Sequence, residues 1–160
     1  EYAMHCLLYM VGIPSGKSVG VKELAKYQGV SETYLSKIFT KLRKSGITKS
    51  TPGVKGGYEL ARPAENISFW DIVEAIEGTA PLFQCAEIRQ NEILLDKNNL
   101  PDTHTKCPCL IKVVMLEAEE QMKNYLRNKT LRWLRDELNC KIPEEHAKAT
   151  IEWFNNPESR

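Results

Sequence analysis

Residues 21–46 read VKELAKYQGVSETYLSKIFTKLRKSG and hold two short apolar patterns on either side of Gly29. The pattern before the glycine predicts a short helix that ends near residue 27. Ser31 is typical of a helix N-cap, and Gly46 is typical of the position just after a helix. Between them, four apolar residues recur at helical spacing: Leu35, Ile38, Phe39 and Leu42. The stretch therefore predicts two helices joined by a tight turn, the second with a single apolar face.

The segments around this stretch complete an ordered series of elements. An apolar face predicts a helix over 2–12, and two short strands are expected over 47–51 and 58–61. Between the strands lies PGVKGG (52–57), which has the turn residues of a hairpin. Ser68 begins a capping-box pattern and predicts a further helix. We therefore expect a mainly α (α+β) fold, a winged helix-turn-helix with a two-stranded wing.

The second half of the chain differs in pattern. Residues 78–108 contain scattered glycine, proline and asparagine, which predict irregular structure, and a long helix is expected over 109–138. That helix carries more apolar residues than one small domain face can cover, so we expect it to join two copies of the chain: Leu110, Val113, Val114, Leu116, Met122, Tyr125, Leu126, Leu131, Leu134 and Leu138. The predicted division is a DNA-binding domain over 1–80, a cysteine-containing sensor loop over 81–108, and the long dimerisation helix with a C-terminal helix over 109–160.

Charge is distributed unevenly, although the net charge is only +1. Between Thr33 and Tyr58 there is no acidic residue, and the basic ones are Lys37, Lys41, Arg43, Lys44, Lys49 and Lys55. A stripe of one sign is what a polyanion-binding surface requires, whereas the alternative is a solvated helix face. The helix that begins after Ser31 would place the face opposite its apolar stripe in the major groove of DNA. The glycine-rich hairpin tip, with Lys49 and Lys55 nearby, would approach the sugar-phosphate backbone.

Other classes of protein are disfavoured. No apolar run approaches the roughly 20 residues of a membrane span, and the first ten residues lack the basic region and cleavage site of a signal peptide. We therefore expect a cytoplasmic protein with reduced thiols and no membrane partner. The sequence contains no nucleophile elbow, phosphate loop or paired-carboxylate motif, so we do not expect an enzyme.

Several stretches match a pattern found in bacterial regulators: Tyr2-Ala3, VKELA (21–25), SETYLSKIFTKLRKSG (31–46), GVKGGY (53–58) and DIVEAIEG (71–78). Together they resemble the IscR/NsrR/CymR family of winged helix-turn-helix transcription regulators. The resemblance implies a homodimer on a pseudo-palindromic operator, and we expect it to act as a repressor. The predicted DNA contacts are Ser31, Thr33, Tyr34, Lys37, Lys41, Lys49, Gly53 and Lys55. Pro52 stands where some members have an arginine that enters the minor groove, so Lys55 is the substitute candidate.

The resemblance also bears on the cysteines. Many members hold a 2Fe–2S cluster through three cysteines before the long helix, and this chain has Cys85, Cys107 and Cys109 there, with His104 as a candidate fourth ligand. The spacing departs from the family, because 21 residues separate Cys85 from Cys107. The alternatives are a cluster-free regulator with a thiol-based sensor, or an interaction protein whose main partner is a metabolic enzyme. Cys109 at a helix start should have a lowered thiol pKa, and Cys6 should be a core residue.

Overall fold

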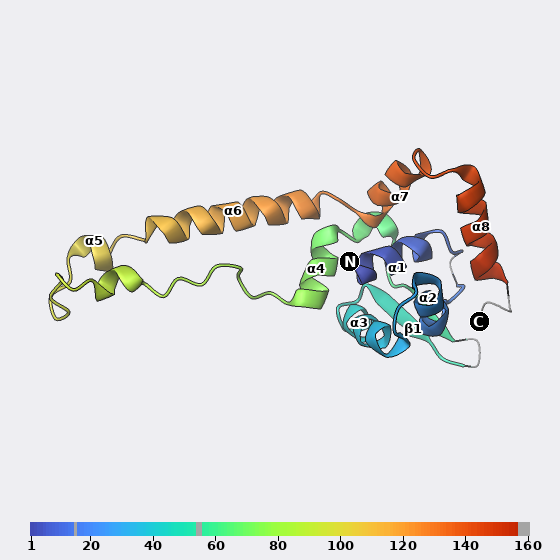
Figure 1. Cartoon of the computed structure of the whole chain (residues 1–160), viewed down its shortest axis with the longest axis horizontal. Helices are drawn as coiled ribbons and strands as arrows, with labels where there is room; N and C mark the ends of the chain where they lie inside the picture. The colour runs from blue at the N-terminus through green and yellow to red at the C-terminus, as the bar shows by residue number, and fades with distance from the viewer. Residues whose placement is uncertain (15, 54–55, 157–160) are drawn as a thin grey trace. The chain divides into compact units, whose positions relative to one another are not determined.

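The computed structural model describes residues 1–14, 16–53 and 56–156, and its elements follow the expected order (Figure 1). The elements are α1 (Tyr2–Val11), α2 (Val21–Gln28), α3 (Glu32–Lys44), β1 (Thr48–Thr51), β2 (Gly57–Leu60), η1 (Ala64–Asn66), α4 (Phe69–Glu77), η2 (Ile88–Asn91), α5 (Asp102–Thr105), α6 (Leu110–Arg127), α7 (Leu131–Asn139) and α8 (Glu144–Asn155). The expected mainly helical fold with a two-stranded wing is confirmed. No helix in the described ranges is both long and apolar enough to cross a membrane.

The described chain packs as two compact units. Residues 1–78 and 126–160 form the first, and residues 79–125 form the second. The first unit therefore contains the helix-turn-helix and the wing together with the last two helices. The expected division at residues 80 and 108 stays a prediction.

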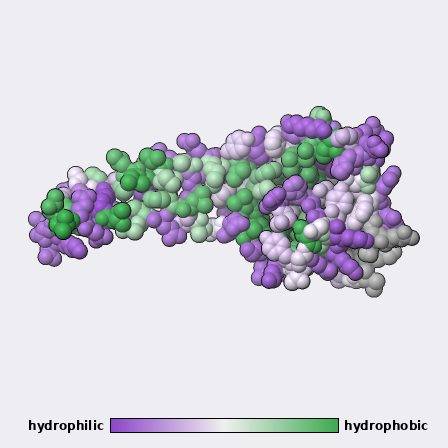
Figure 2. Space-filling view, in the orientation of Figure 1, coloured by the Kyte–Doolittle hydropathy of each residue, from purple (hydrophilic) through white to green (hydrophobic). Residues whose placement is uncertain are grey.

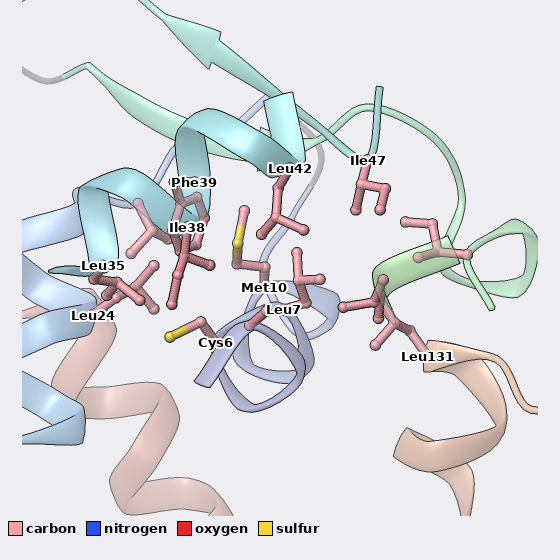
Figure 3. Packing of buried hydrophobic residues seen from close by; sticks show 14 of the residues in the cluster. Cys6, Leu7, Met10, Leu24, Leu35, Ile38, Phe39, Leu42, Ile47 and Leu131 are labelled. Carbon is pink, nitrogen blue, oxygen red and sulfur yellow. The ribbon is translucent and has the colours of Figure 1, made fainter. Parts of the chain in front are cut away.

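The core of the first unit is built on α3 (Figure 3). All four residues of the predicted apolar stripe are buried, and they meet apolar side chains of α1 such as Leu7 and Met10. Cys6 lies among them and is fully buried, and this burial raises the pKa of its thiol to about 12. Cys6 is therefore the core residue that we expected, unsuited to thiolate chemistry.

Two local features fix the helix-turn-helix. Gly29 ends α2 with a φ of 66°, a left-handed conformation that glycine adopts without the steric cost of a Cβ. Ser31 then caps α3, because its side chain accepts a hydrogen bond from the backbone N–H of Tyr34 (3.4 Å). The turn and the cap together set the direction in which α3 leaves α2.

The wing is an antiparallel pair in which Thr48 faces Leu60 and Thr51 faces Gly57. The strand β2 is attached to the chain ahead of α2 by the bridge between Val19 and Tyr58. A Cβ at Gly57 would lie 2.4 Å from the carbonyl oxygen of Val19, so only glycine allows this close approach of two backbones. The wing is thus held to the helix-turn-helix by backbone contacts.

One expectation was wrong: the single long helix over 109–138 is two helices, α6 and α7. The reason is hydrogen bonding to a distant part of the chain. The N–H of Phe69 donates to the carbonyl of Lys129 (2.7 Å), and the N–H of Leu131 donates to the carbonyl of Ile67 (2.9 Å). Thr130 then caps α7 by accepting from the N–H of Trp133 (3.1 Å).

The last helix, α8, is part of the first unit rather than an appendage. Phe154 is buried, and its ring centroid lies 4.9 Å from that of Tyr27 on α2 and 5.8 Å from that of Tyr9 on α1. Trp153 also lies 4.9 Å from Tyr27. This aromatic cluster joins α8 to the first two helices.

Candidate nucleic-acid interface and cysteine cluster

The predicted contact residues at the N-terminal end of α3 are exposed: Ser31, Thr33, Tyr34 and Lys37. Tyr34 is 50% exposed, and its ring stands edge-on to that of Tyr2, with 5.6 Å between the centroids. This contact holds the phenol at the rim of the helix, where its hydroxyl can donate or accept a hydrogen bond.

The lysines of α3 are not equivalent. The ammonium group of Lys41 donates to the carbonyl oxygen of Ile76 in the last turn of α4 (2.6 Å), where a cation is favoured by the helix dipole. Lys37, Arg43 and Lys44 are exposed and make no ion pair with the described residues. Arg43 and Lys44 belong to the basic stripe but not to the predicted contacts.

The wing carries less free charge than its sequence suggests. Lys49 is paired across the two strands with Glu59, with 3.4 Å between the ammonium and the carboxylate. Glu59 lies one residue beyond the acid-free stretch, so the linear charge pattern does not reveal the ion pair that the hairpin creates. Gly53 is exposed at the turn, whereas Lys55 lies outside the described residues.

In the second unit two of the three cysteines come together. The Cys85 thiol is one of the groups that lower the pKa of Cys109, although 23 residues separate the two cysteines in the sequence. The same thiol donates to a carboxylate oxygen of Glu87 (3.7 Å). Arg89 lies near both sulfurs. Cys107 is exposed, and its contribution is a backbone carbonyl that accepts from Arg89 (2.6 Å).

Arg89 is a site residue that the sequence did not indicate. Its guanidinium also donates to a carboxylate oxygen of Glu87 (2.9 Å) and to the carbonyl of Thr103 (2.9 Å). The backbone N–H of Glu87 in turn donates to the sulfur of Cys85 (3.4 Å). One arginine thus fixes the loop around the two thiols, and no motif in the sequence marks it.

The thiol of Cys109 is activated as expected. The backbone N–H of Lys112 in the first turn of α6 is the largest cause that lowers the pKa of Cys109. The N–H of Ile111, the Cys85 thiol and the positive charge of Arg89 act in the same direction, against the desolvation that raises it. Cys109 is therefore the better nucleophile of the thiol pair Cys85–Cys109.

The expected cluster ligands do not converge in this arrangement. The described residues contain no group of three or more His, Cys, Asp or Glu side chains placed to hold a metal ion. The Nδ1 atom of His104 lies 3.0 Å from the hydroxyl of Thr103 instead. The 2Fe–2S cluster therefore stays a prediction, and the visible absorption spectrum of anaerobically purified protein is the measurement that tests it.

Comparison with known proteins identifies the family of this chain. Residues 1–137 match the family model Rrf2, described as an iron-dependent transcriptional regulator. The chain belongs to the Rrf2 family. It is 34% identical to protein rrf2 of Nitratidesulfovibrio vulgaris over 131 residues, which cover 82% of this chain and 80% of that protein. It is 41% identical to the transcriptional regulator IscR of Cereibacter sphaeroides over 81 residues, 49% of this chain and 52% of that protein.

The fold agrees with the Rrf2 assignment. The structure of CymR, the global cysteine regulator of B. subtilis, matches with a TM-score of 0.59 at 21% identity, and the match covers 84% of this chain and 93% of that one. The resemblance to the IscR and CymR regulators is thus confirmed, and the chain is a DNA-binding transcription regulator and not an enzyme.

The activation of Cys109 gives a first prediction. The rate of alkylation of Cys109 by iodoacetamide, measured by peptide mass spectrometry, should become half-maximal below pH 9.0, which is the ordinary pKa of a cysteine thiol. Arg89→Gln should move this midpoint to higher pH, because it removes a positive charge that favours the thiolate. Arg132→Gln, on α7, should leave the midpoint unchanged. A wild-type midpoint at or above 9.0 contradicts the assignment.

Proposed function

We propose that this Rrf2-family regulator represses transcription as a homodimer on a pseudo-palindromic operator. The observation that carries the proposal is the division of α3 into a buried apolar face and an exposed polar face that begins at the capped N-terminus. A recognition helix uses its N-terminal residues for base edges, which assigns direct readout to Thr33, Tyr34 and Lys37. Ser31, besides capping the helix, lies where a phosphate would approach.

The wing supplements α3. Gly53 and Lys55 are assigned to the sugar-phosphate backbone, as their place at the hairpin tip in the sequence suggests. Lys41 and Lys49 would have to leave Ile76 and Glu59 before they could bind phosphate, so they contribute to DNA binding less than Lys37 does.

Lys37→Ala should weaken binding to the DNA upstream of the protein's own gene by about fivefold or more, measured by fluorescence anisotropy across a salt series. If Lys37 contacts phosphate, binding to all DNA sequences should weaken alike, and the slope of log affinity against log salt concentration should fall in magnitude by about one. If Lys37 reads a base, specificity for the operator should relax. Lys141→Ala is the matched control, because its ammonium is already paired with Glu137 on α7. Unchanged binding by a folded Lys37→Ala variant would contradict the assigned surface and favour an interaction protein that binds a metabolic enzyme.

The dimer is proposed from α6. Exposed side chains recur along it at alternating steps of four and three residues: Ile111, Met115, Ala118, Met122 and Tyr125. This is the spacing of a seam between two paired helices, and Figure 2 shows apolar side chains gathered over α6. Two copies joined through this seam would present two recognition helices about one DNA turn, ~34 Å, apart.

A Met115→Glu, Met122→Glu double variant should sediment as a monomer at micromolar concentration, because it places two buried like charges on each side of the seam. Glu117→Lys changes the charge on the exposed face of α6 opposite the seam and should leave the dimer intact. A wild-type chain that sediments only as a monomer would contradict the proposed assembly.

A second candidate function, redox sensing, is favoured by the thiol pair Cys85–Cys109. The Cys109 thiolate attacks one oxygen of hydrogen peroxide and the O–O bond breaks, so that a sulfenic acid forms on Cys109. The other oxygen leaves as hydroxide and takes up a proton to become water. The Cys85 thiol then displaces the second oxygen as water, and a disulfide results. Peroxide is reduced and the two thiols are oxidised, with Cys107 taking no part. The new bond would tie residue 85 to the start of α6, the proposed dimerisation helix.

Peroxide should therefore lower the operator affinity of the wild type several-fold, and peptide mapping should find Cys85 joined to Cys109. Cys85→Ser and Cys109→Ser should lose the response, whereas Cys107→Ser is the matched control and should keep it. Equal affinities in reducing and oxidising buffer would assign these thiols a structural role.

A further inference from the structure

A cavity of about 750 Å³ lies within the first unit, between α1, α7 and α8. Its size is within the range of roughly 300–1,000 Å³ that is typical of small-molecule sites. Most of its wall is apolar, and the main apolar side chains are Leu8, Ile13, Leu138, Ile142, Ile151 and Phe154. No part of the proposed DNA interface or of the cysteine cluster contributes to it.

One charged side chain in this wall has no partner among the described residues. Arg135 of α7 is partly buried, and it forms neither a hydrogen bond nor an ion pair with any described residue. Its neighbours on the same helix behave differently, since Arg132 is bound to Asp136 (3.0 Å) and Glu137 to Lys141 (3.1 Å). Arg135 instead turns toward α1.

Gly12 makes the room for this orientation. A Cβ at Gly12 would lie 3.0 Å from Nη1 and 3.2 Å from Nη2 of Arg135, so the guanidinium rests against the bare backbone at the end of α1. A planar guanidinium offers paired N–H donors that match the two oxygens of a carboxylate.

The other charges in the wall favour an anion as well. Lys17 contributes a second cation, whose ammonium group donates to the side chain of Asn155. The one carboxylate in the wall belongs to Glu144, and Lys148 neutralises it at 2.6 Å. An apolar wall with a net positive charge complements a molecule that has an apolar body and a single negative group.

We propose that this cavity binds a small amphipathic carboxylate, whose acid group pairs with Arg135 and whose apolar part lies against α8. The ligand would touch α1, which packs on α3, and α8, which packs on α2. In addition, Thr150 in the cavity wall is hydrogen-bonded to the hydroxyl of Tyr27 on α2 (2.9 Å). The site is therefore an effector site for DNA binding, a consequence that rests on the proposed function, whereas binding itself does not.

The experiment uses two fluorescent probes on the full chain without DNA: anilinonaphthalene sulfonate, which is anionic, and the uncharged N-phenylnaphthylamine. Decanoate and decanol serve as competitors with and without a carboxylate. Arg135→Gln should weaken binding of the sulfonate probe and of decanoate about tenfold or more, because a hydrogen-bonded charge pair is lost, and should change binding of the uncharged probe less than twofold. Arg132→Gln should behave as wild type.

A second variant keeps the test independent of Arg135. Ala147→Trp fills the cavity and should abolish saturable binding of both probes while circular dichroism shows an intact fold. The proposal is overturned if Arg135→Gln and Arg132→Gln bind the probes alike, if Ala147→Trp still binds them, or if wild-type binding vanishes as the dimer forms, since a second copy then occupies the cavity. All these measurements are made without DNA, so a negative result would contradict the proposed ligand site whether or not the chain binds an operator.

Discussion

The burial of one face of α3 against α1 is the interaction on which the rest of the first unit depends. Leu35, Phe39 and Leu42 are completely inaccessible to solvent, and the loss of any one would leave a cavity that costs about 2–5 kcal/mol. Because a helix has a fixed period, burying this stripe determines which side chains face outward. The exposure of Lys37 and Thr33 is thus a consequence of packing.

The return of the chain to this core is a second, non-local constraint. Backbone hydrogen bonds between residues 67–69 and 129–131 end α6 and begin α7. They hold α7 against the rest of the first unit, and Leu131 is fully buried there. Without this interruption a continuous helix would carry Arg135 and α8 away from α1, and neither the aromatic cluster around Tyr27 nor the cavity beside Gly12 would exist.

These two constraints also separate what the sequence predicts from what it does not. The apolar stripe of α3, the cap at Ser31 and the hairpin are local patterns, so a reading along the chain found them. The break at residues 128–130 was missed because its cause lies some 60 residues away and the apolar pattern continues through it. The same reason hid the contact of Lys41 with Ile76, the pair of Lys49 with Glu59, and the place of Arg89 beside two thiols. The proximity of Cys85 to Cys109 was the one non-local feature that the resemblance to the family had suggested in part.

The distribution of charge has a consequence for how the proposed operator is recognised. Lys41 and Lys49 are both engaged with groups of the protein, so the free positive charge of the described interface is concentrated on Lys37, Arg43 and Lys44 of a single helix. Non-specific affinity for DNA grows with the number of phosphates neutralised, so we expect little of it from this protein, which has few free cations on the described interface and a net charge of +1. Discrimination between operator and bulk DNA then depends mainly on hydrogen bonds from the N-terminal residues of α3 and on the alignment of two such helices. A ligand or a disulfide that displaces one helix relative to its partner by a fraction of a DNA turn would remove most of the binding free energy, because little unspecific attraction remains to compensate.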